Sequence, residues 1–90
     1  MIAREVRIAN RLGLHARAAA RFVNAAGRFR SQVTLVRASR RADGKSILGI
    51  LLLAASRGSS VVLEVEGPDE SEAADALEAL VSGGFGEGAA

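Results

Sequence analysis

The chain has one histidine, and its position suits phosphate chemistry. His15 follows the turn residue Gly13 and precedes a stretch with helical periodicity, so we expect it at or beside a helix N-cap. The first amides of that helix, those of Ala16 and Arg17, lack intrahelical partners and favour a bound phosphate. Arg17 can reach the same anion through its guanidinium. Helix polarity disfavours the imidazolium form, which keeps a ring nitrogen free as a nucleophile. The pattern predicts a phosphohistidine; the plainer alternative is a surface histidine that closes a loop.

Ser46 is the second side chain that could carry chemistry. It follows the turn signal Asp43-Gly44 and precedes the apolar run Ile47–Ala55, which favours an N-cap role. A phosphate there would add about −1.5 to −2 charges, which a helix N-terminus tolerates but an acidic partner would not. Capping alone is enough to explain the serine, so both interpretations stay open.

Composition excludes several classes of site. A chain of 90 residues has room for one domain. It contains no cysteine and one histidine. Disulfides, thiol catalysis and the usual multi-histidine zinc sites are therefore excluded, and we expect no metal and no cofactor. The N-terminus lacks the apolar core of a signal peptide, and the longest apolar run is far below the roughly 20 residues of a membrane span. We expect a soluble cytoplasmic protein.

The net charge of +2 hides an uneven distribution. Residues 1–45 carry eleven Lys or Arg and two acids, for a net +9, whereas residues 46–90 carry one Arg and eight acids, for a net −7. A basic half motivates an anionic partner, including nucleic acid. The chain has three Phe but no Tyr or Trp for stacking on bases, and its last helix is acidic. Nucleic-acid binding is therefore the least favoured of the functions considered.

Hydrophobic periodicity predicts four strands and three helices. We expect strands at residues 2–8, 31–37, 40–43 and 60–66, and helices from Ala16 to a stop at Gly27, from Ile47, and from Asp69. The apolar run after Ser46 also fits a buried strand, but the serine cap favours a helix. Asp69 and Glu72 approximate a capping box. The order strand, helix, strand, strand, helix, strand, helix favours an α+β open-faced two-layer sandwich, with a four-stranded antiparallel sheet and three helices on one face. We assign residues 1–82 to one domain and residues 83–90 to a flexible glycine-rich tail.

Two motifs carry a family resemblance. GLHARAAARFV (Gly13–Val23), followed by GKSILGI (Gly44–Ile50), resembles the HPr phosphocarrier family of the phosphoenolpyruvate-dependent phosphotransferase system. The resemblance continues through the GPD turn at Gly67–Asp69 and the DALEAL segment, so it covers most of the chain. In that family the histidine matching His15 accepts a phosphoryl group on Nδ1 from phospho-enzyme I and passes it to a histidine of a IIA-type protein. The residue matching Arg17 assists with the phosphate. The resemblance implies a phosphoryl carrier rather than a turnover enzyme.

The resemblance also implies regulation and docking. Many members carry a serine at the position of Ser46 that a bifunctional HPr kinase/phosphorylase phosphorylates. The expected docking residues are Ala20, Asn24, Ile47, Leu48 and Leu51, with a cationic rim of Arg21, Arg40, Arg41 and Lys45. We expect Ile50 and Leu53 in the core. The expected partners are proteins, without nucleic acid or membrane insertion, and we expect a monomer.

Ala18 departs from the family pattern, which usually has proline at this position. Alanine removes some pre-organisation of the first helical turn but restores an N–H that could face phosphate. Together with LLLAAS after the second helix, it resembles proteobacterial members that serve regulatory or nitrogen relays. The remaining alternative is a regulatory binding module controlled by Ser46 that transfers no phosphate, although such a module would not need His15 and Arg17.

Overall fold

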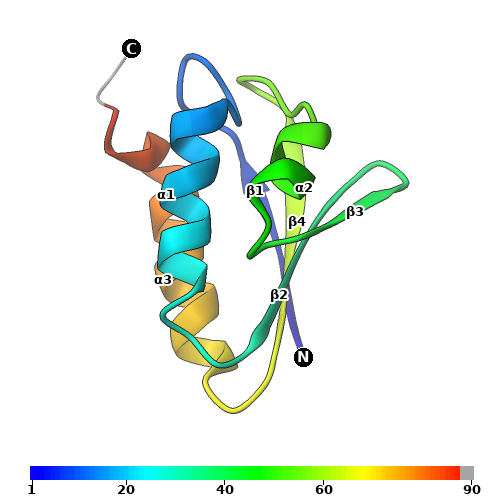
Figure 1. Cartoon of the computed structure of the whole chain (residues 1–90), viewed down its shortest axis with the longest axis vertical. Helices are drawn as coiled ribbons and strands as arrows, with labels where there is room; N and C mark the ends of the chain where they lie inside the picture. The colour runs from blue at the N-terminus through cyan, green and yellow to red at the C-terminus, as the bar shows by residue number, and fades with distance from the viewer. Residues whose placement is uncertain (88–90) are drawn as a thin grey trace.

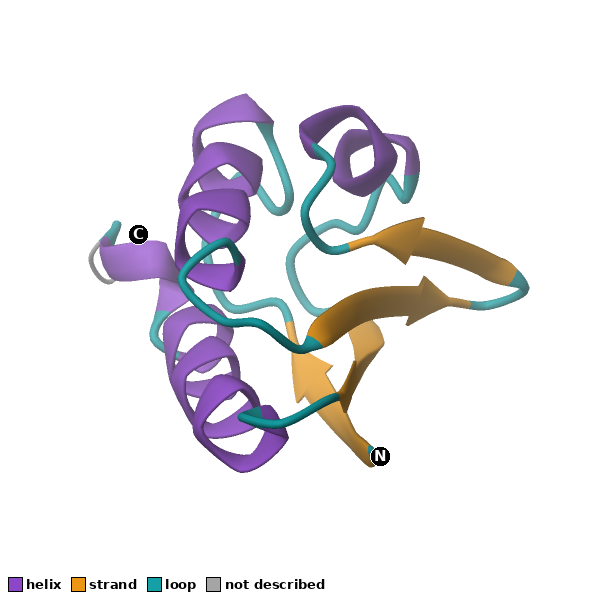
Figure 2. Ribbon diagram, turned by 60° about the horizontal axis from the view of Figure 1, so that its bottom comes forward, coloured by secondary structure: helices purple, strands orange, loops and turns teal. Residues whose placement is uncertain are grey.

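The computed structural model describes residues 1–87, and its four strands form one antiparallel sheet of order β1-β4-β2-β3. The strands are β1 (Ile2–Arg7), β2 (Gln32–Arg37), β3 (Arg40–Asp43) and β4 (Ser60–Glu66). The helices are α1 (Ala16–Ala26), α2 (Ile47–Leu52) and α3 (Glu70–Ser82), and a short 3₁₀ turn, η1 (Gly84–Gly86), follows. The helices lie on one side of the sheet (Figures 1 and 2). The predicted α+β open-faced sandwich is confirmed.

Alternation along the strands builds the sheet side of the core. The inward residues of β2 and β4 pair directly, Val33 with Val65 and Leu35 with Leu63, and all four are buried. Because successive side chains point to opposite faces, the residues between them lie on the face away from the helices. One sheet face is therefore apolar and covered, as the period-2 pattern predicts.

Small residues line the inward face of α1, which packs against α2 and α3. The buried positions of this helix are spaced by one, three and four residues: Ala18, Ala19, Phe22 and Ala26. This stripe matches the predicted inward face. The apolar run after Ser46 forms a helix and not a strand, and Ile50 and Leu53 are buried at 0% and 2% exposure, as predicted. Ser46 caps α2, since its hydroxyl accepts a hydrogen bond from the amide of Gly49 at 3.1 Å.

Asp69 precedes α3, but the predicted capping box is wrong. The Asp69 side chain makes no cap hydrogen bond; it accepts from the amides of Arg30 and Ser31, both at 2.9 Å. Its carboxylate therefore joins the start of α3 to the loop before β2. The hydroxyl of Ser31 contributes most to holding the pKa of Asp69 below its ordinary value, and the amide of Arg30 adds to this against the effect of burial.

The C-terminal end also differs from the predicted flexible tail. Residues 84–86 form η1, and Phe85 in that turn is 1% exposed. The glycines that suggested flexibility instead allow the backbone to turn, because Gly84 and Gly86 adopt φ of +69° and +73°. The turn brings residues 84–87 back beside the start of α1 (Figure 1, red beside blue). Residues 88–90 of the predicted tail lie outside the described residues.

Gly13 fixes the loop that leads into α1. Its φ is +67°, and a Cβ at this position would lie 2.5 Å from the carbonyl oxygen of Ala55. Next to it, the amide of Leu14 donates to that same carbonyl at 3.0 Å. A residue without a side chain is required here, and its contact ties the start of α1 to the segment after α2.

Candidate functional site

His15 is the N-cap of α1, as the sequence predicts, and both of its ring nitrogens have partners. Nδ1 accepts a hydrogen bond from the amide of Arg17 at 3.3 Å. Nε2 lies 2.7 Å from Oε2 of Glu87. Because the amide is a donor and an ionised carboxylate is an acceptor, one ring proton satisfies both contacts only when it is on Nε2. The Nδ1 lone pair is therefore directed toward the first turn of α1.

Glu87 sits in a polar cluster at this site. The amide group of Asn10 donates to Oε1 of Glu87 at 3.2 Å and to the carbonyl of Gly13 at 2.6 Å. Arg17 lies further away, with 3.9 Å between its Nε and Oε2 of Glu87. Burial opposes ionisation of the Glu87 carboxyl, but the hydrogen bonds from His15 and Asn10, with the nearby charges, hold its pKa below the ordinary value. The group is thus a carboxylate at neutral pH.

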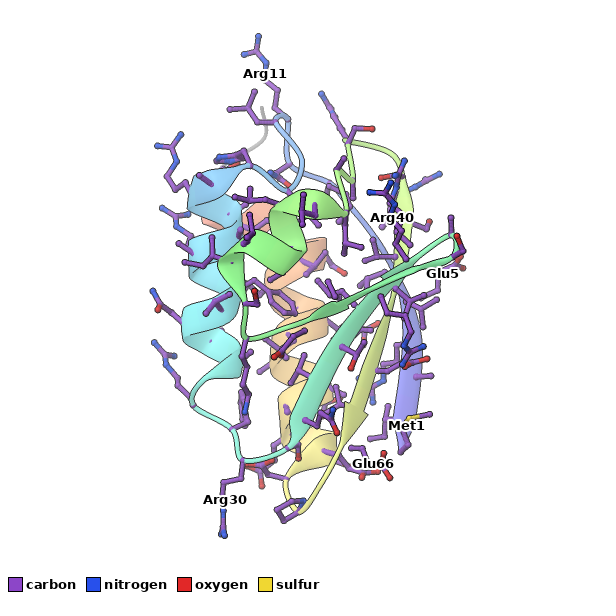
Figure 3. The ribbon with its side chains drawn as sticks, turned by 45° about the vertical axis from the view of Figure 1, so that its right-hand side comes forward. Met1, Glu5, Arg11, Arg30, Arg40 and Glu66 are labelled. Atoms are coloured by element: carbon purple, nitrogen blue, oxygen red, sulfur yellow. The ribbon has the colours of Figure 1, made fainter. Side chains whose placement is uncertain are left out.

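A basic pocket opens beside the histidine. It is lined by Arg11, Leu12, Arg17, Arg21 and Glu87. Arg11 projects from the end of the molecule where α1 begins, whereas Arg30 projects from the opposite end (Figure 3). The cations of the basic half are therefore not collected on one face. Those near His15 suit a compact anion more than an extended polyanion.

The residues predicted to dock partners differ in exposure. Leu48 is 67% and Ile47 43% exposed at the start of α2. Asn24 is exposed on α1, whereas Ala20 is partly buried and Leu51 packs partly against the core. Leu12 and Leu52 are also exposed, at 62% and 60%, although neither is among the residues predicted to dock partners.

The predicted cationic rim is only partly assembled. Arg21 donates to the carbonyl of Phe85, and Arg40 donates to the carbonyl of Leu52 at 3.1 Å at the end of α2. Lys45 reaches the carbonyl of Phe29 at 2.9 Å. Arg41 pairs with Glu64 at 2.6 Å.

Arg41 is not part of the rim, because its salt bridge with Glu64 reaches across the sheet from β3 to β4. A second pocket there is lined by Met1, Gln32, Thr34, Arg41, Glu64 and Glu66. Thr34 and Glu64 are paired residues of the sheet, between the buried positions of their strands, so this pocket is on the face away from the helices.

The family model described as "PTS HPr component phosphorylation site" matches residues 2–83, a segment that contains the chain's one histidine. The chain belongs to the HPr family. Phosphocarrier protein HPr of Cupriavidus necator is 54% identical over 88 residues, covering 98% of this chain and 99% of that protein. HPr of Pseudomonas putida is 52% identical over 89 residues, with 98% and 99% coverage. The crystal structure of HPr-C-His from Thermoanaerobacter tengcongensis has a TM-score of 0.93 and 44% identity, covering 97% of this chain and 98% of that chain.

Two residues of this HPr-family site escaped sequence reasoning. Asn10 has the sequence context of an ordinary turn residue, and Glu87 lies 72 positions from His15 in a stretch whose composition predicts a flexible tail. A signal was present in Phe85, because a single large apolar side chain among glycines can anchor a chain end.

Within residues 1–87, no helix is long and apolar enough to cross a membrane, and no cluster of His, Asp or Glu could hold a metal ion.

Proposed function

We propose that the protein is a phosphoryl carrier of the phosphotransferase system, in which His15 accepts a phosphoryl group on Nδ1 from phospho-enzyme I and passes it to a histidine of a IIA-type protein. The observation that carries the proposal is the orientation of the ring. Nδ1 holds a lone pair at the start of α1, and only a long hydrogen bond of 3.3 Å from the Arg17 amide occupies it. Such a weak bond is easily given up to an incoming phosphorus.

The proposed transfer needs little from this chain beyond the ring and its surroundings. The Nδ1 lone pair attacks phosphorus, a P–N bond forms, and the bond to the donor atom of enzyme I breaks with its electron pair returning to the donor. The phosphoryl oxygens then lie beside the amides of Ala16 and Arg17 at the helix start, which have no intrahelical partner. The Arg17 amide is released for this role when phosphorus takes the place of its hydrogen bond to Nδ1. The Arg17 side chain is 66% exposed, so its guanidinium is free to turn onto the phosphoryl group.

Labelling with phosphoenolpyruvate and purified enzyme I tests this proposal. We expect one acid-labile, base-stable phosphate per chain, and none in His15→Ala. Arg17→Ala should be labelled more slowly, because it loses a mobile cation at the acceptor. Label that persists in His15→Ala would contradict the proposal.

We propose the apolar start of α2 as the surface that docks both partner proteins. Ile47 and Leu48 are exposed there, and Arg40 donates to the carbonyl of Leu52 at the end of the same helix. The helix packs against α1, which begins after the N-cap His15. An apolar centre with a charged surround is a typical protein interface. Leu48→Asp should slow labelling by enzyme I by roughly tenfold while small phosphoryl donors react normally. Ala79→Asp on the exposed side of α3 is the matched control, and equal slowing in both variants would contradict the assignment.

Ser46 is the proposed regulatory position. Its hydroxyl is partly exposed, begins α2, and immediately precedes Ile47 and Leu48. A phosphate added there by an HPr kinase/phosphorylase would place a double negative charge at the docking surface, which disfavours an acidic partner. We expect slower transfer from enzyme I to the Ser46-phosphorylated protein. A normal transfer rate would rule out a switch at this serine.

We further propose that the protein acts as a monomer in the cytoplasm.

A further inference from the structure

We propose that Glu87 is a positioning residue for phosphoryl transfer: it holds the Nε2 proton of His15 and so leaves Nδ1 as the phosphoryl acceptor. This inference rests on the proposed function, because it assigns a role within the same transfer. It stands on two contacts at opposite sides of one ring, Glu87 Oε2 at 2.7 Å from Nε2 and the Arg17 amide at 3.3 Å from Nδ1.

The two contacts are unequal, and the difference has a consequence. The bond to the carboxylate is short and charge-assisted, whereas the bond from the amide is long and neutral. The ring is therefore held mainly from the Nε2 side. A phosphorus atom arriving at Nδ1 displaces the weak contact and leaves the strong one in place, so the ring stays oriented during transfer.

The same carboxylate balances the charge that transfer creates. When the Nδ1 lone pair forms the P–N bond, the ring keeps its Nε2 proton and becomes positively charged. Glu87 is then a negative group in contact with that ring, and its side chain is only 14% exposed, so solvent screens the attraction weakly. Keeping the Nε2 proton also leaves the phosphorylated ring ready to depart as neutral imidazole when the group moves to the next acceptor. Carboxylates that face imidazoles in this way orient the ring and stabilise its cation.

Packing of the chain end holds Glu87 in place. Phe85 is buried, and Arg21 of α1 donates to the carbonyl of Phe85. Asn10, which is 1% exposed, donates to Oε1 of Glu87. The carboxylate is thus fixed by η1, by α1 and by the loop after β1. The chain end thus contacts two neighbouring elements that are more than 70 positions away in the sequence, which a passive surface contact does not require.

The test compares Glu87→Ala and Glu87→Gln with the matched exposed control Glu72→Gln. Long-range ¹H–¹⁵N correlation on ¹⁵N-histidine-labelled protein reports which ring nitrogen carries the proton, and backbone amide spectra of the same samples report folding. We expect the wild type and Glu72→Gln to show the Nε2–H tautomer. Its fraction should fall in Glu87→Gln, which keeps an acceptor but loses the charge, and fall further in Glu87→Ala.

Phosphoramidate, a small phosphoryl donor, gives a second readout without enzyme I. At early times the wild type should form the Nδ1 product, and Glu87→Ala should form a mixture with the Nε2 product, as resolved by ³¹P and ¹⁵N spectra. With enzyme I, Glu87→Ala should be labelled roughly tenfold more slowly.

The possible outcomes separate this inference from the proposed function. Unchanged tautomer and unchanged product in a folded Glu87→Ala protein would overturn the role of Glu87, even if His15 is labelled normally. If wild-type protein takes no label from enzyme I, the carrier function fails, while the tautomer and phosphoramidate measurements still decide the role of Glu87. Slower labelling of both Glu87→Ala and Glu72→Gln would also contradict the inference, since it would show a general effect of surface charge.

Discussion

Phe85→Ala tests whether the end of the chain is a structural part of the site. Phe85 is 1% exposed, and truncating a buried phenylalanine costs about 3–5 kcal/mol when the fold must keep the cavity. Because η1 is a single short 3₁₀ turn, residues 84–87 can instead undock together, which limits the loss to the free energy that holds this short segment. We therefore expect the free energy of unfolding to fall by about 2–4 kcal/mol. Phe85 adopts a φ of +57°, which is unfavourable for alanine as well as for phenylalanine. The loss of stability therefore reports the lost side-chain packing and not a change in backbone strain.

The assay is urea unfolding of the purified protein, paired with the rate of labelling by enzyme I. Undocking removes Glu87 from His15, so Phe85→Ala should slow labelling as much as Glu87→Ala does. The double variant should be no slower than Phe85→Ala, because both changes break one contact. Phe29→Ala is the control: Phe29 is partly buried against the core, so stability should fall while the labelling rate stays normal. A stability loss in Phe85→Ala below about 0.5 kcal/mol, the range of ordinary surface substitutions, would refute the account of the chain end.

Three further predictions concern the loop before α1, the cap of α2 and the contact that joins α3 to the loop before β2. Gly13→Ala should cost about 1–3 kcal/mol of stability and slow labelling, because φ is +67° and the new Cβ would meet the carbonyl of Ala55 at 2.5 Å; unchanged urea unfolding would contradict the tight contact. Ser46→Ala should cost about 1 kcal/mol through the lost cap of α2 but leave labelling within twofold, and a labelling defect would show that the hydroxyl does more than cap. Asp69 has a depressed pKa, chiefly through the Ser31 hydroxyl, so its contribution to stability is present above its ordinary value of 3.8 and is lost as pH falls through the lower folded value. Asp69→Asn should therefore be less stable than the wild type at pH 6 and lose less stability between pH 5 and 3; equal acid sensitivity of the two in thermal melts would contradict this.

Most of the fold could be predicted from the sequence because its signals are local. Alternation in residues 60–66 and the small-residue stripe of α1 each bury one face, and the caps at His15 and Ser46 mark helix starts within one residue. The capping box at Asp69 failed for a reason that local spacing cannot reveal. Its carboxylate accepts a hydrogen bond from the amide of Ser31, 38 residues earlier, in place of a hydrogen bond from the first turn of its own helix.

The site could be predicted only as far as its residues are neighbours in the sequence. His15 and Arg17 share the first turn of one helix, so their spacing carries the chemistry. Glu87 joins them from across the fold, and its glycine-rich surroundings resemble those of a disordered end. What orders that end is tertiary packing of Phe85, together with glycines that adopt positive φ. Local composition does not report either feature.

The most direct measurement is to locate the phosphoryl group on the protein after reaction with phosphoenolpyruvate and a catalytic amount of enzyme I. We expect a single phosphate on Nδ1 of His15, seen in ³¹P and ¹⁵N spectra and absent from His15→Ala. Phosphate on Nε2, on Ser46, or on no residue of the wild-type protein would contradict it.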